Sequence, residues 1–278
     1  MDGRITNRPK KSVGGEDRIG NLPESILSHI LSRLPTTDQA VRTSVLSRKW
    51  EYKWTCIYNL TFDDRKRAQY SKKLRRPEKA DFMKFVDRVL VLCKNTNIQK
   101  LELLFSEHYD PFRMKTWITA ALTSTVQRLC ISYEGDLVLA PRTESPWSLP
   151  IFDKLTHLKV YSAGMAIECN EPLIDFLKMT PALESLKFTG RYSPKAADNY
   201  DGIELVHGDF LSCLKVVKLE YYHTSPRDSP LVKFLLLNAV ELEELLIYWQ
   251  HEGLEVDKGQ NQLLKFQRAS NHVSIVSS

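Results

Sequence analysis

A pattern of three apolar positions recurs six times in the second half of the chain, and it constrains the fold more than any other sequence feature. Each copy has an aliphatic residue, two other residues, a second aliphatic, one other residue and a large apolar residue. The copies are IQKLEL from Ile98, VQRLCI from Val126, LTHLKV from Leu155, LESLKF from Leu183, LKVVKL from Leu214 and LEELLI from Leu242. Successive starting positions differ by 28, 29, 28, 31 and 28 residues. So even a spacing predicts an array of repeated structural units.

Each unit is expected to contain a strand and a helical segment. Alternation over the last four positions of the pattern predicts a short strand with one buried face. The segments MKTWITAALTS, PLIDFLKMT and SPLVKFLLLNA follow such strands and have helical character. One unit cannot bury its apolar face alone, whereas stacked neighbours can, and the period is close to that of leucine-rich repeats. The sequence therefore predicts an α/β solenoid, a short curved array of six irregular repeats with a parallel sheet on its concave face.

A helix with a wide apolar stripe is predicted near the N-terminus, in NLPESILSHILSRLP. Pro23 suits the first turn of this helix, and Pro35 ends it. Its apolar residues follow a single helical stripe. They are Ile26, Leu27, Ile30, Leu31 and Leu34.

Two further short helices are predicted after this one. Thr36 and Gln39 match a capping box that opens the second helix, which extends through Val41 and Val45. Ser47 favours a third helix with Trp50 and Trp54 on one face. About 45 residues bury too little surface to be stable alone. The apolar faces therefore either pack against the rest of this chain or form a docking surface for another protein.

The segment DRIGNLPESILSHILSRLPTTDQAVRTSVLSRKWEYKW resembles an F-box of the kind common in plant F-box proteins with leucine-rich repeats. The resemblance implies a small three-helix F-box that binds a Skp1-like adaptor and, through it, a cullin. It also implies that the two Trp residues complete a small bundle whose surface is finished by another chain. The implied adaptor contacts are Leu22, Pro23, Ile26, Leu27, Ile30, Leu31, Val41, Val45, Leu46, Trp50 and Trp54.

The rest of the chain divides by composition. The run RKRAQYSKKLRRPEK has eight basic residues and one Glu, so its local charge is +7. The net charge of the whole chain is +5, so the rest of the chain carries −2. A charge excess confined to one polar run favours a solvated linker over a nucleic-acid surface. LLKFQRASNHVSIV, with LVKFLLLNAVELEELLI, is similar to the C-terminal FBD-type region of some of these plant proteins. The expected division is 1–17 flexible segment, 18–64 F-box, 65–80 basic linker, 81–250 repeat array and 251–278 FBD-like tail.

Composition narrows the function class further. Five Cys residues are widely spaced with no CxxC pair, which favours buried thiols in a reducing compartment, nucleus or cytoplasm, over a disulfide framework or a metal site. The sequence contains no run of 18 apolar residues, so no membrane span is predicted. Glycine-rich phosphate loops, HExxH and GxSxG are absent from the sequence. We therefore expect no catalytic residue, no cofactor and no bound metal, and neither a nucleic acid nor a membrane as partner.

The residue between the two apolar positions of each strand is expected to face the open side of the sheet. In repeat order these residues are Glu102, Cys130, Lys159, Lys187, Lys218 and Leu246. Three neighbouring Lys residues repel one another, and Glu184 and Glu220 are the expected source of relief. Either the Lys side chains simply splay into water, or the stripe recognises an acidic or phosphorylated target. The candidate target-binding residues are Arg128, His157, Lys159, Tyr161, Lys187, Lys218 and Tyr248.

The function that the resemblance implies is the substrate-recognition subunit of an SCF-type (Skp1–cullin–F-box) E3 ubiquitin ligase. In such a subunit the F-box binds the adaptor, the repeats bind the target protein, and other subunits perform the chemistry. Two alternatives stay open from the sequence. One is a repeat scaffold that binds partners without a ligase, and the other is a receptor whose target binding depends on a small molecule at the same face.

Overall fold

A computed structural model describes residues 18–64, 79–93, 97–106, 109–122, 125–133, 150–167, 171–192, 210–222, 230–249 and 267–277. The predicted flexible segment at 1–17, nearly all of the predicted basic linker and most of the predicted C-terminal tail lie outside these residues. Within the described part, no helix has both the length and the apolar character needed to cross a bilayer.

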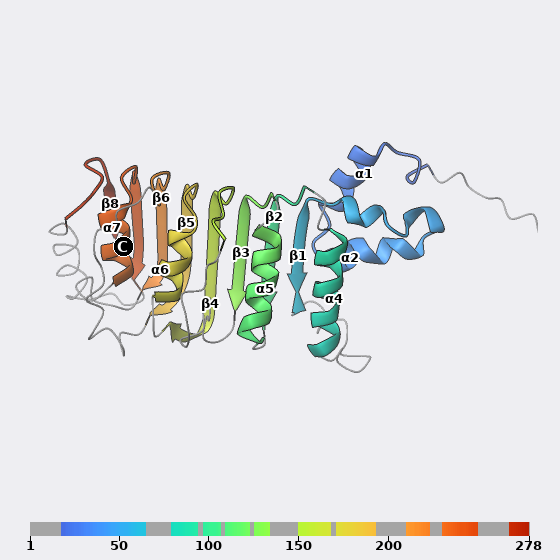
Figure 1. Ribbon diagram of the computed structural model, residues 1–278, viewed down its shortest axis with the longest axis horizontal. Helices are drawn as coiled ribbons and strands as arrows, with labels where there is room; N and C mark the ends of the chain where they lie inside the picture. The colour runs from blue at the N-terminus through green and yellow to red at the C-terminus, as the bar shows by residue number, and fades with distance from the viewer. Residues whose placement is uncertain are drawn as a thin grey trace, which may run out of the picture.

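The described strands form one parallel sheet of eight, in which every strand pairs with its neighbour in sequence, so the order is β1 to β8 (Figure 1). Sequential order in a parallel sheet is what a repeated strand-and-crossover unit produces. The strands are β1 (Asn59–Asp63), β2 (Lys100–Phe105), β3 (Arg128–Tyr133), β4 (His157–Ile167), β5 (Ser185–Tyr192), β6 (Val216–Tyr222), β7 (Glu244–Trp249) and β8 (Ser274–Ser277).

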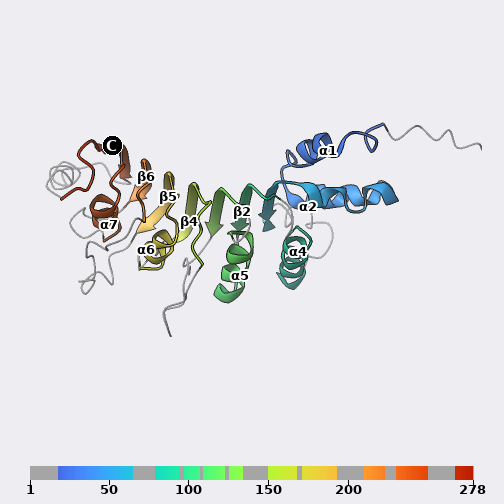
Figure 2. The same cartoon turned by 45° about the horizontal axis from the view of Figure 1, so that its top comes forward.

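Four helices cover one face of this sheet, and Figure 2 shows them on the same side of the row of strands. They are α4 (Lys79–Leu92), α5 (Pro111–Leu122), α6 (Glu171–Lys178) and α7 (Pro230–Asn238). Three of them, α5, α6 and α7, lie where the sequence predicts helical segments. The opposite face of the sheet carries no helix in the described part of the chain, and we call it the open face.

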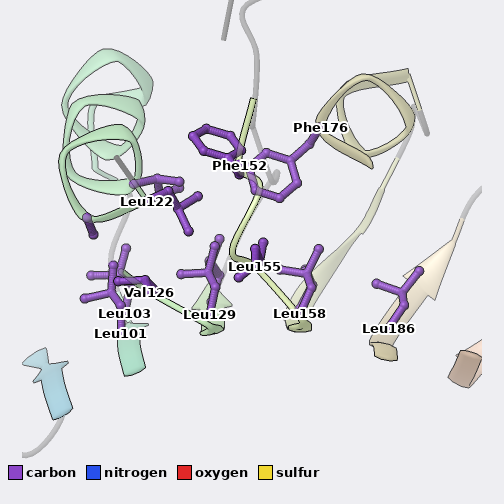
Figure 3. Packing of buried hydrophobic residues seen from close by; sticks show 14 of the residues in the cluster. Leu101, Leu103, Leu122, Val126, Leu129, Phe152, Leu155, Leu158, Phe176 and Leu186 are labelled. Carbon is purple, nitrogen blue, oxygen red and sulfur yellow. The ribbon is translucent and has the colours of Figure 1, made fainter. Parts of the chain in front are cut away.

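The core lies between the sheet and its helices. The apolar positions of successive strands point toward the helical layer, where Leu122, Phe152 and Phe176 meet them (Figure 3). The strand residues of this layer include Leu101, Leu103, Leu129, Leu158 and Leu186, and each is at most 1% exposed. The predicted burial of one strand face is therefore confirmed. Because each unit shares its apolar face with two neighbours, stability is spread along the array.

A backbone link recurs between neighbouring units at the start of the strands. The carbonyl of Tyr58 accepts hydrogen bonds from the N–H groups of both Gln99 and Lys100, at 2.8 and 3.1 Å. The carbonyls of Gln99, Gln127, Thr156, Glu184, Lys215 and Glu243 accept from the following unit in the same way, Glu243 through a single bond from Ser274. This repetition sets one register at the start of the strands, so equivalent residues of successive units lie side by side there. The register shifts only further along, after Ser162 of β4 and after Glu220 of β6.

The sheet has two more strands than the six predicted repeats. β1 lies within the segment predicted as F-box, and it carries the same apolar pattern at Ile57, Leu60 and Phe62, which are all buried. β8 lacks the pattern, since Ser277 occupies the third apolar position, opposite Ile247 of β7. The array therefore begins before the segment in which the repeats were recognised and extends beyond it.

The N-terminal cluster, residues 18–58, contains two α-helices, α1 (Glu24–Leu31) and α2 (Thr37–Arg42). Pro23 precedes α1 as its N-cap instead of occupying the first turn. The predicted cap of α2 is confirmed, because the Thr36 hydroxyl accepts from the Gln39 N–H.

The predicted third helix is wrong. The second helix, expected to extend through Val45, ends at Arg42 and is followed by the 3-10 turn η1 (Thr43–Val45). Two further 3-10 turns, η2 (Arg48–Trp50) and η3 (Lys53–Cys56), replace the predicted third helix. Ser47 makes no capping hydrogen bond, and its φ of −168° and ψ of 169° are those of extended chain. An extended residue at this point separates the turns, so a continuous helix cannot form through residues 43–56.

Candidate functional site

Four of the residues expected to contact an adaptor form the core of the N-terminal cluster instead of its surface. Leu27 and Leu31 of α1 and Trp50 and Trp54 of the turns are each at most 6% exposed. The Trp54 indole N–H donates to the Glu51 carbonyl at 3.0 Å, so its polar edge is satisfied inside the cluster. The two Trp residues thus belong to the same buried cluster as Leu27 and Leu31 of α1.

Four other expected contacts stand out from the same elements into solvent. Ile26 and Ile30 of α1 are 46% and 45% exposed, and Val45 and Leu46 are 84% and 65% exposed. We call these four residues the apolar face. Pro23 is also exposed, while Leu22 and Val41 are half-buried. The stripe on α1 is therefore divided, with one row packed inward and the other uncovered.

Two exposed apolar residues of the cluster were missed by the sequence reasoning. Ile19 is 58% exposed and Tyr52 is 57% exposed. Ile19 lies before the first helix and Tyr52 between two turns, so neither belongs to a periodic stripe that marks a helix face. Both add to the apolar surface that residues 18–58 present.

The cluster is joined to the sheet by buried hydrogen bonds along the outer edge of β1. The Thr61 N–H donates to the Thr37 hydroxyl at 2.8 Å, and the Tyr58 N–H donates to the Ser32 hydroxyl at 3.0 Å. The Asn59 side-chain amide donates to the Ser32 carbonyl at 3.2 Å. Thr37 and Ser32 are 2% and 5% exposed. The cluster thus satisfies donors on the edge of the sheet, which otherwise would be open to pairing with another chain.

The open face brings the predicted middle residues into one column. Strand register pairs Glu102 with Cys130, Cys130 with Lys159, Lys159 with Lys187, Lys187 with Lys218, and Lys218 with Leu246. The predicted alignment of the three Lys residues is confirmed. A second column on the same face places Tyr161, Thr189, Glu220 and Tyr248 side by side.

Two of the three Lys residues share one carboxylate. Glu220 lies 3.0 Å from Lys187 Nζ and 3.1 Å from Lys218 Nζ, and the Thr189 hydroxyl donates to it at 2.8 Å. The Lys187 ammonium also lies 5.7 Å from the centre of the Tyr161 ring, and that of Lys218 lies 4.8 Å from the Tyr248 ring. Both distances are in the range of cation–π contacts.

The charge state of Glu220 follows from this arrangement. Burial alone raises the pKa of this carboxyl, but hydrogen bonds from Lys187, Thr189 and Lys218 outweigh it and lower the pKa to about 2. The expected relief of repulsion by Glu220 is therefore confirmed. The same expectation for Glu184 is wrong, because among the described residues its exposed carboxylate forms no ion pair and only its backbone carbonyl is used.

The remaining predicted target-binding residues lie on β3 and β4. Arg128 pairs directly with His157 in the register, and Lys159 follows His157 on the same strand face. All three side chains are exposed. On the neighbouring β2, Lys100 already binds Glu102 at 2.8 Å, and Thr61 of β1 donates to the same carboxylate.

The cysteines do not all match the expectation of buried thiols. Cys93 and Cys130 are buried, Cys56 is half-buried and Cys213 is exposed, and none of these four described cysteines is in a disulfide. Cys169 lies outside the described residues. No group of three or more His, Cys, Asp and Glu side chains that suits a metal ion occurs in the described part of the chain.

Comparison with known proteins finds an F-box domain at the N-terminal cluster and relatives that combine an F-box with leucine-rich repeats. Residues 19–58 match the model of the F-box domain. A putative F-box/LRR-repeat protein of Arabidopsis thaliana is 38% identical over 134 residues, which are 47% of this chain and 27% of that protein. An F-box/LRR-repeat protein of the same plant is 29% identical over 238 residues, or 83% of this chain and 58% of the relative.

An F-box/FBD/LRR-repeat protein of Arabidopsis thaliana is 32% identical over 163 residues, 58% of this chain and 32% of that protein. The chain spans between 27% and 58% of the length of the first three relatives. The matched F-box ends one residue before β1 begins, and the longest match continues across the sheet. The chain therefore carries an F-box domain followed by an eight-stranded parallel sheet, and it is similar to F-box/LRR-repeat proteins of Arabidopsis thaliana.

Proposed function

We propose that this protein is the substrate-recognition subunit of an SCF-type E3 ubiquitin ligase, in which the F-box binds a Skp1-like adaptor and the sheet binds a target protein. The observation that carries the proposal is the apolar face, Ile26, Ile30, Val45 and Leu46, which the chain leaves uncovered. Several exposed apolar side chains on one small helical unit are typical of a protein-binding surface.

The energetics favour a partner over solvent at this face. Complete burial of a Val, Leu or Ile side chain contributes about 1.5–3 kcal/mol. Four side chains that are already partly covered therefore offer roughly 4–8 kcal/mol before the entropic cost of association. The buried set, Leu27, Leu31, Trp50 and Trp54, supports the face from within. We assign these four a structural part in adaptor binding and not direct contact.

We infer that the array is a leucine-rich-repeat solenoid whose open face is its concave side. The even spacing, the sequential parallel strands and the helices on one face all support this shape. The hydrogen bonds at Ser32 and Thr37 fix the F-box against the first strand. A fixed joint holds a target on the sheet at a constant position relative to the adaptor, and ubiquitin transfer is then carried out by other subunits.

The location of the protein follows from the same proposal. The free thiols of the described cysteines suit a reducing compartment, the nucleus or the cytoplasm, in which a cullin complex assembles.

The test is capture of a purified Skp1-like adaptor by the intact chain and by the double variant Ile26→Asp with Ile30→Asp. Both positions are exposed, so the variant is expected to fold, whereas Asp at Leu27 or Leu31 would disrupt the core. We expect the variant to lose at least 100-fold in affinity.

Val91→Asp serves as the matched control, because Val91 is also an exposed apolar residue of a helix but lies on α4. It is expected to bind the adaptor like the unchanged chain. Undiminished capture by the Ile26/Ile30 variant, or equal loss in the control, would contradict the proposal.

A further inference from the structure

We infer that Arg128, His157 and Lys159 form a docking site for a short acidic segment of a protein target. This inference rests on the proposed function and specifies the chemistry of the target. The three side chains are exposed on the open face, and neighbouring strands place them next to one another. Strand spacing puts Arg128 about 5 Å from His157, and Lys159 lies about 7 Å further along β4.

Uncompensated positive charge is concentrated at this site. No carboxylate of the described residues pairs with Arg128 or Lys159. By contrast, Lys187 and Lys218 share Glu220, and Lys100 binds Glu102. Breaking these existing pairs to bind a target costs energy, whereas Arg128 and Lys159 have no ion pair with another described residue to give up. An anionic ligand is therefore drawn to β3 and β4 before any other part of the face.

Acidic residues on both sides limit the length of such a ligand. Glu102 lies on β2, Glu220 on β6 and Glu244 on β7, all on the open face. A long acidic chain across the strands would compete with Glu102 and Glu220 for the Lys residues that they bind, and it would meet the like charge of Glu244, which is unfavourable. The arrangement therefore selects a segment in which only two or three acidic residues lie next to one another.

The surface suits carboxylates better than a phosphate group. Phosphate sites commonly use converging backbone N–H groups or a helix N-terminus. Here the described backbone N–H groups of β3 and β4 are engaged in the parallel ladder, and the helices cover the other face. Side chains alone supply the donors, spread over two strands. In an extended peptide, alternate side chains lie about 7 Å apart, which matches the separation of His157 and Lys159 on their strand.

The ring of His157 is oriented by its neighbour. The Thr156 hydroxyl donates to the Gln127 carbonyl at 3.1 Å and lies 2.8 Å from Nδ1 of His157. Because its proton is used on the carbonyl, the hydroxyl accepts from Nδ1–H, which leaves Nε2 as the ring nitrogen without a partner among the described residues. A ring held in this way can meet a ligand without losing further freedom.

The experiment measures fluorescence anisotropy of labelled Gly–Ser peptides with the full chain at low ionic strength. One peptide carries three consecutive Glu residues, a second carries three Gln residues, and a third carries a single phosphoserine. A short single-stranded DNA is the fourth probe. We expect the Glu peptide to bind at least tenfold more tightly than the Gln peptide, with an affinity that falls as salt is added.

Lys159→Glu is expected to weaken binding of the Glu peptide at least tenfold. Lys84→Glu makes the same change of charge at an exposed position, 78% of the side chain being accessible, on the helix α4 behind the sheet, and is expected to change it less than twofold. Equal loss in both variants, or equal binding of the Glu and Gln peptides, would overturn the inference. Tighter binding of the phosphoserine peptide or of the DNA would overturn the assignment to carboxylates.

Adaptor capture measured on the same samples separates this inference from the proposed function. Lys159→Glu is expected to capture the adaptor fully. Lys159 lies on β4, whereas the F-box lies beside β1, and β2 and β3 are between these two strands (Figure 1). Binding of the Glu peptide without capture of the adaptor would contradict the ligase proposal and support the docking site. Capture of the adaptor without a preference for the Glu peptide would contradict the docking site and support the ligase proposal.

Discussion

Glu220 is a single side chain that organises the middle of the open face. It binds two Lys residues and accepts from Thr189, and its pKa is about 2 in the folded chain. Without it, Lys187 and Lys218 would stand opposite each other with their charges uncompensated.

The variant Glu220→Gln is expected to lower the free energy of unfolding by about 1–2 kcal/mol at neutral pH, after allowance for screening by solvent. Since the folded pKa is lowered, the contribution of Glu220 is complete above its ordinary value of 4.5 and is lost as pH falls toward 2. Urea unfolding of both chains from pH 7 to pH 2.5 measures this. A stability difference that does not shrink on acidification would contradict the assigned pKa.

Asp64 shows the opposite behaviour at the end of β1. Burial is the largest influence and raises the pKa of this carboxyl, although hydrogen bonds from Ser106 and Tyr109 act against it. Its Oδ1 accepts from the Ser106 N–H at 2.8 Å, and its Oδ2 accepts from the Tyr109 hydroxyl at 3.0 Å. The carboxyl thus fixes the chain that leads from β2 to α5, at a cost in desolvation.

We expect Asp64→Asn to keep part of these acceptor contacts and to change the free energy of unfolding by less than about 1 kcal/mol at pH 7. Asp64→Ala leaves the Ser106 N–H unpaired and is expected to lower the free energy of unfolding by about 2–3 kcal/mol. Because the folded pKa is raised, the unchanged chain loses stability relative to the Asn variant as pH rises through that pKa. Thermal unfolding from pH 3 to pH 7 is the measurement. Equal stability of the Asn and Ala variants would show that the hydrogen bonds of Asp64 do not contribute to stability.

At the scale of elements, the joint between α2 and β1 depends on a few buried hydroxyl groups. Thr37→Val keeps the shape of the side chain but leaves the Thr61 N–H without its acceptor. We expect a loss of about 1–3 kcal/mol and faster hydrogen exchange at the Thr61 amide. Thr116→Val, at an exposed position of α5, is the control and is expected to have little effect. An unchanged exchange rate at Thr61 would show that the joint is held by other contacts.

The repeated elements were predictable because their signal is periodic. Three apolar positions per unit fix which residues point inward, and a constant spacing fixes the register that aligns Lys159, Lys187 and Lys218. β1 has the same pattern but starts at Ile57, 41 residues before Ile98, so it falls outside the period. β8 has Ser277 at an inward position and gives no signal at all.

Other features depend on contacts that no local pattern encodes. The spacing of Trp50 and Trp54 is equally compatible with a helix and with 3-10 turns. The non-helical conformation of Tyr52, with φ of −123° and ψ of 6°, separates the two turns that carry them. The expected adaptor residues divided into a core and an exposed set because the sequence marks apolar residues without saying which neighbour covers them. The sequence named both Glu220 and Glu184 as possible partners of Lys187 and Lys218, but it could not decide between them. The choice depends on the position of each Glu in the strand register.

At the scale of the whole molecule, the two proposed binding surfaces lie on different parts of the chain. The apolar face belongs to the F-box, which lies at one end of the row of strands (Figure 1), and the proposed docking residues lie on β3 and β4. Within the described chain they share no residue, so binding at one is expected to leave the affinity of the other unchanged. A coupling greater than about twofold between adaptor and Glu peptide, measured by titrating one in the presence of the other, would contradict this independence.

The central claim is that the F-box leaves apolar surface uncovered until a second protein covers it. Calorimetric titration of a purified Skp1-like adaptor into the intact chain at several temperatures tests it most directly. The account predicts binding at a ratio of one to one with a negative change in heat capacity, because apolar surface leaves water. A folded chain that binds no adaptor, or binds it with no change in heat capacity, would contradict the account.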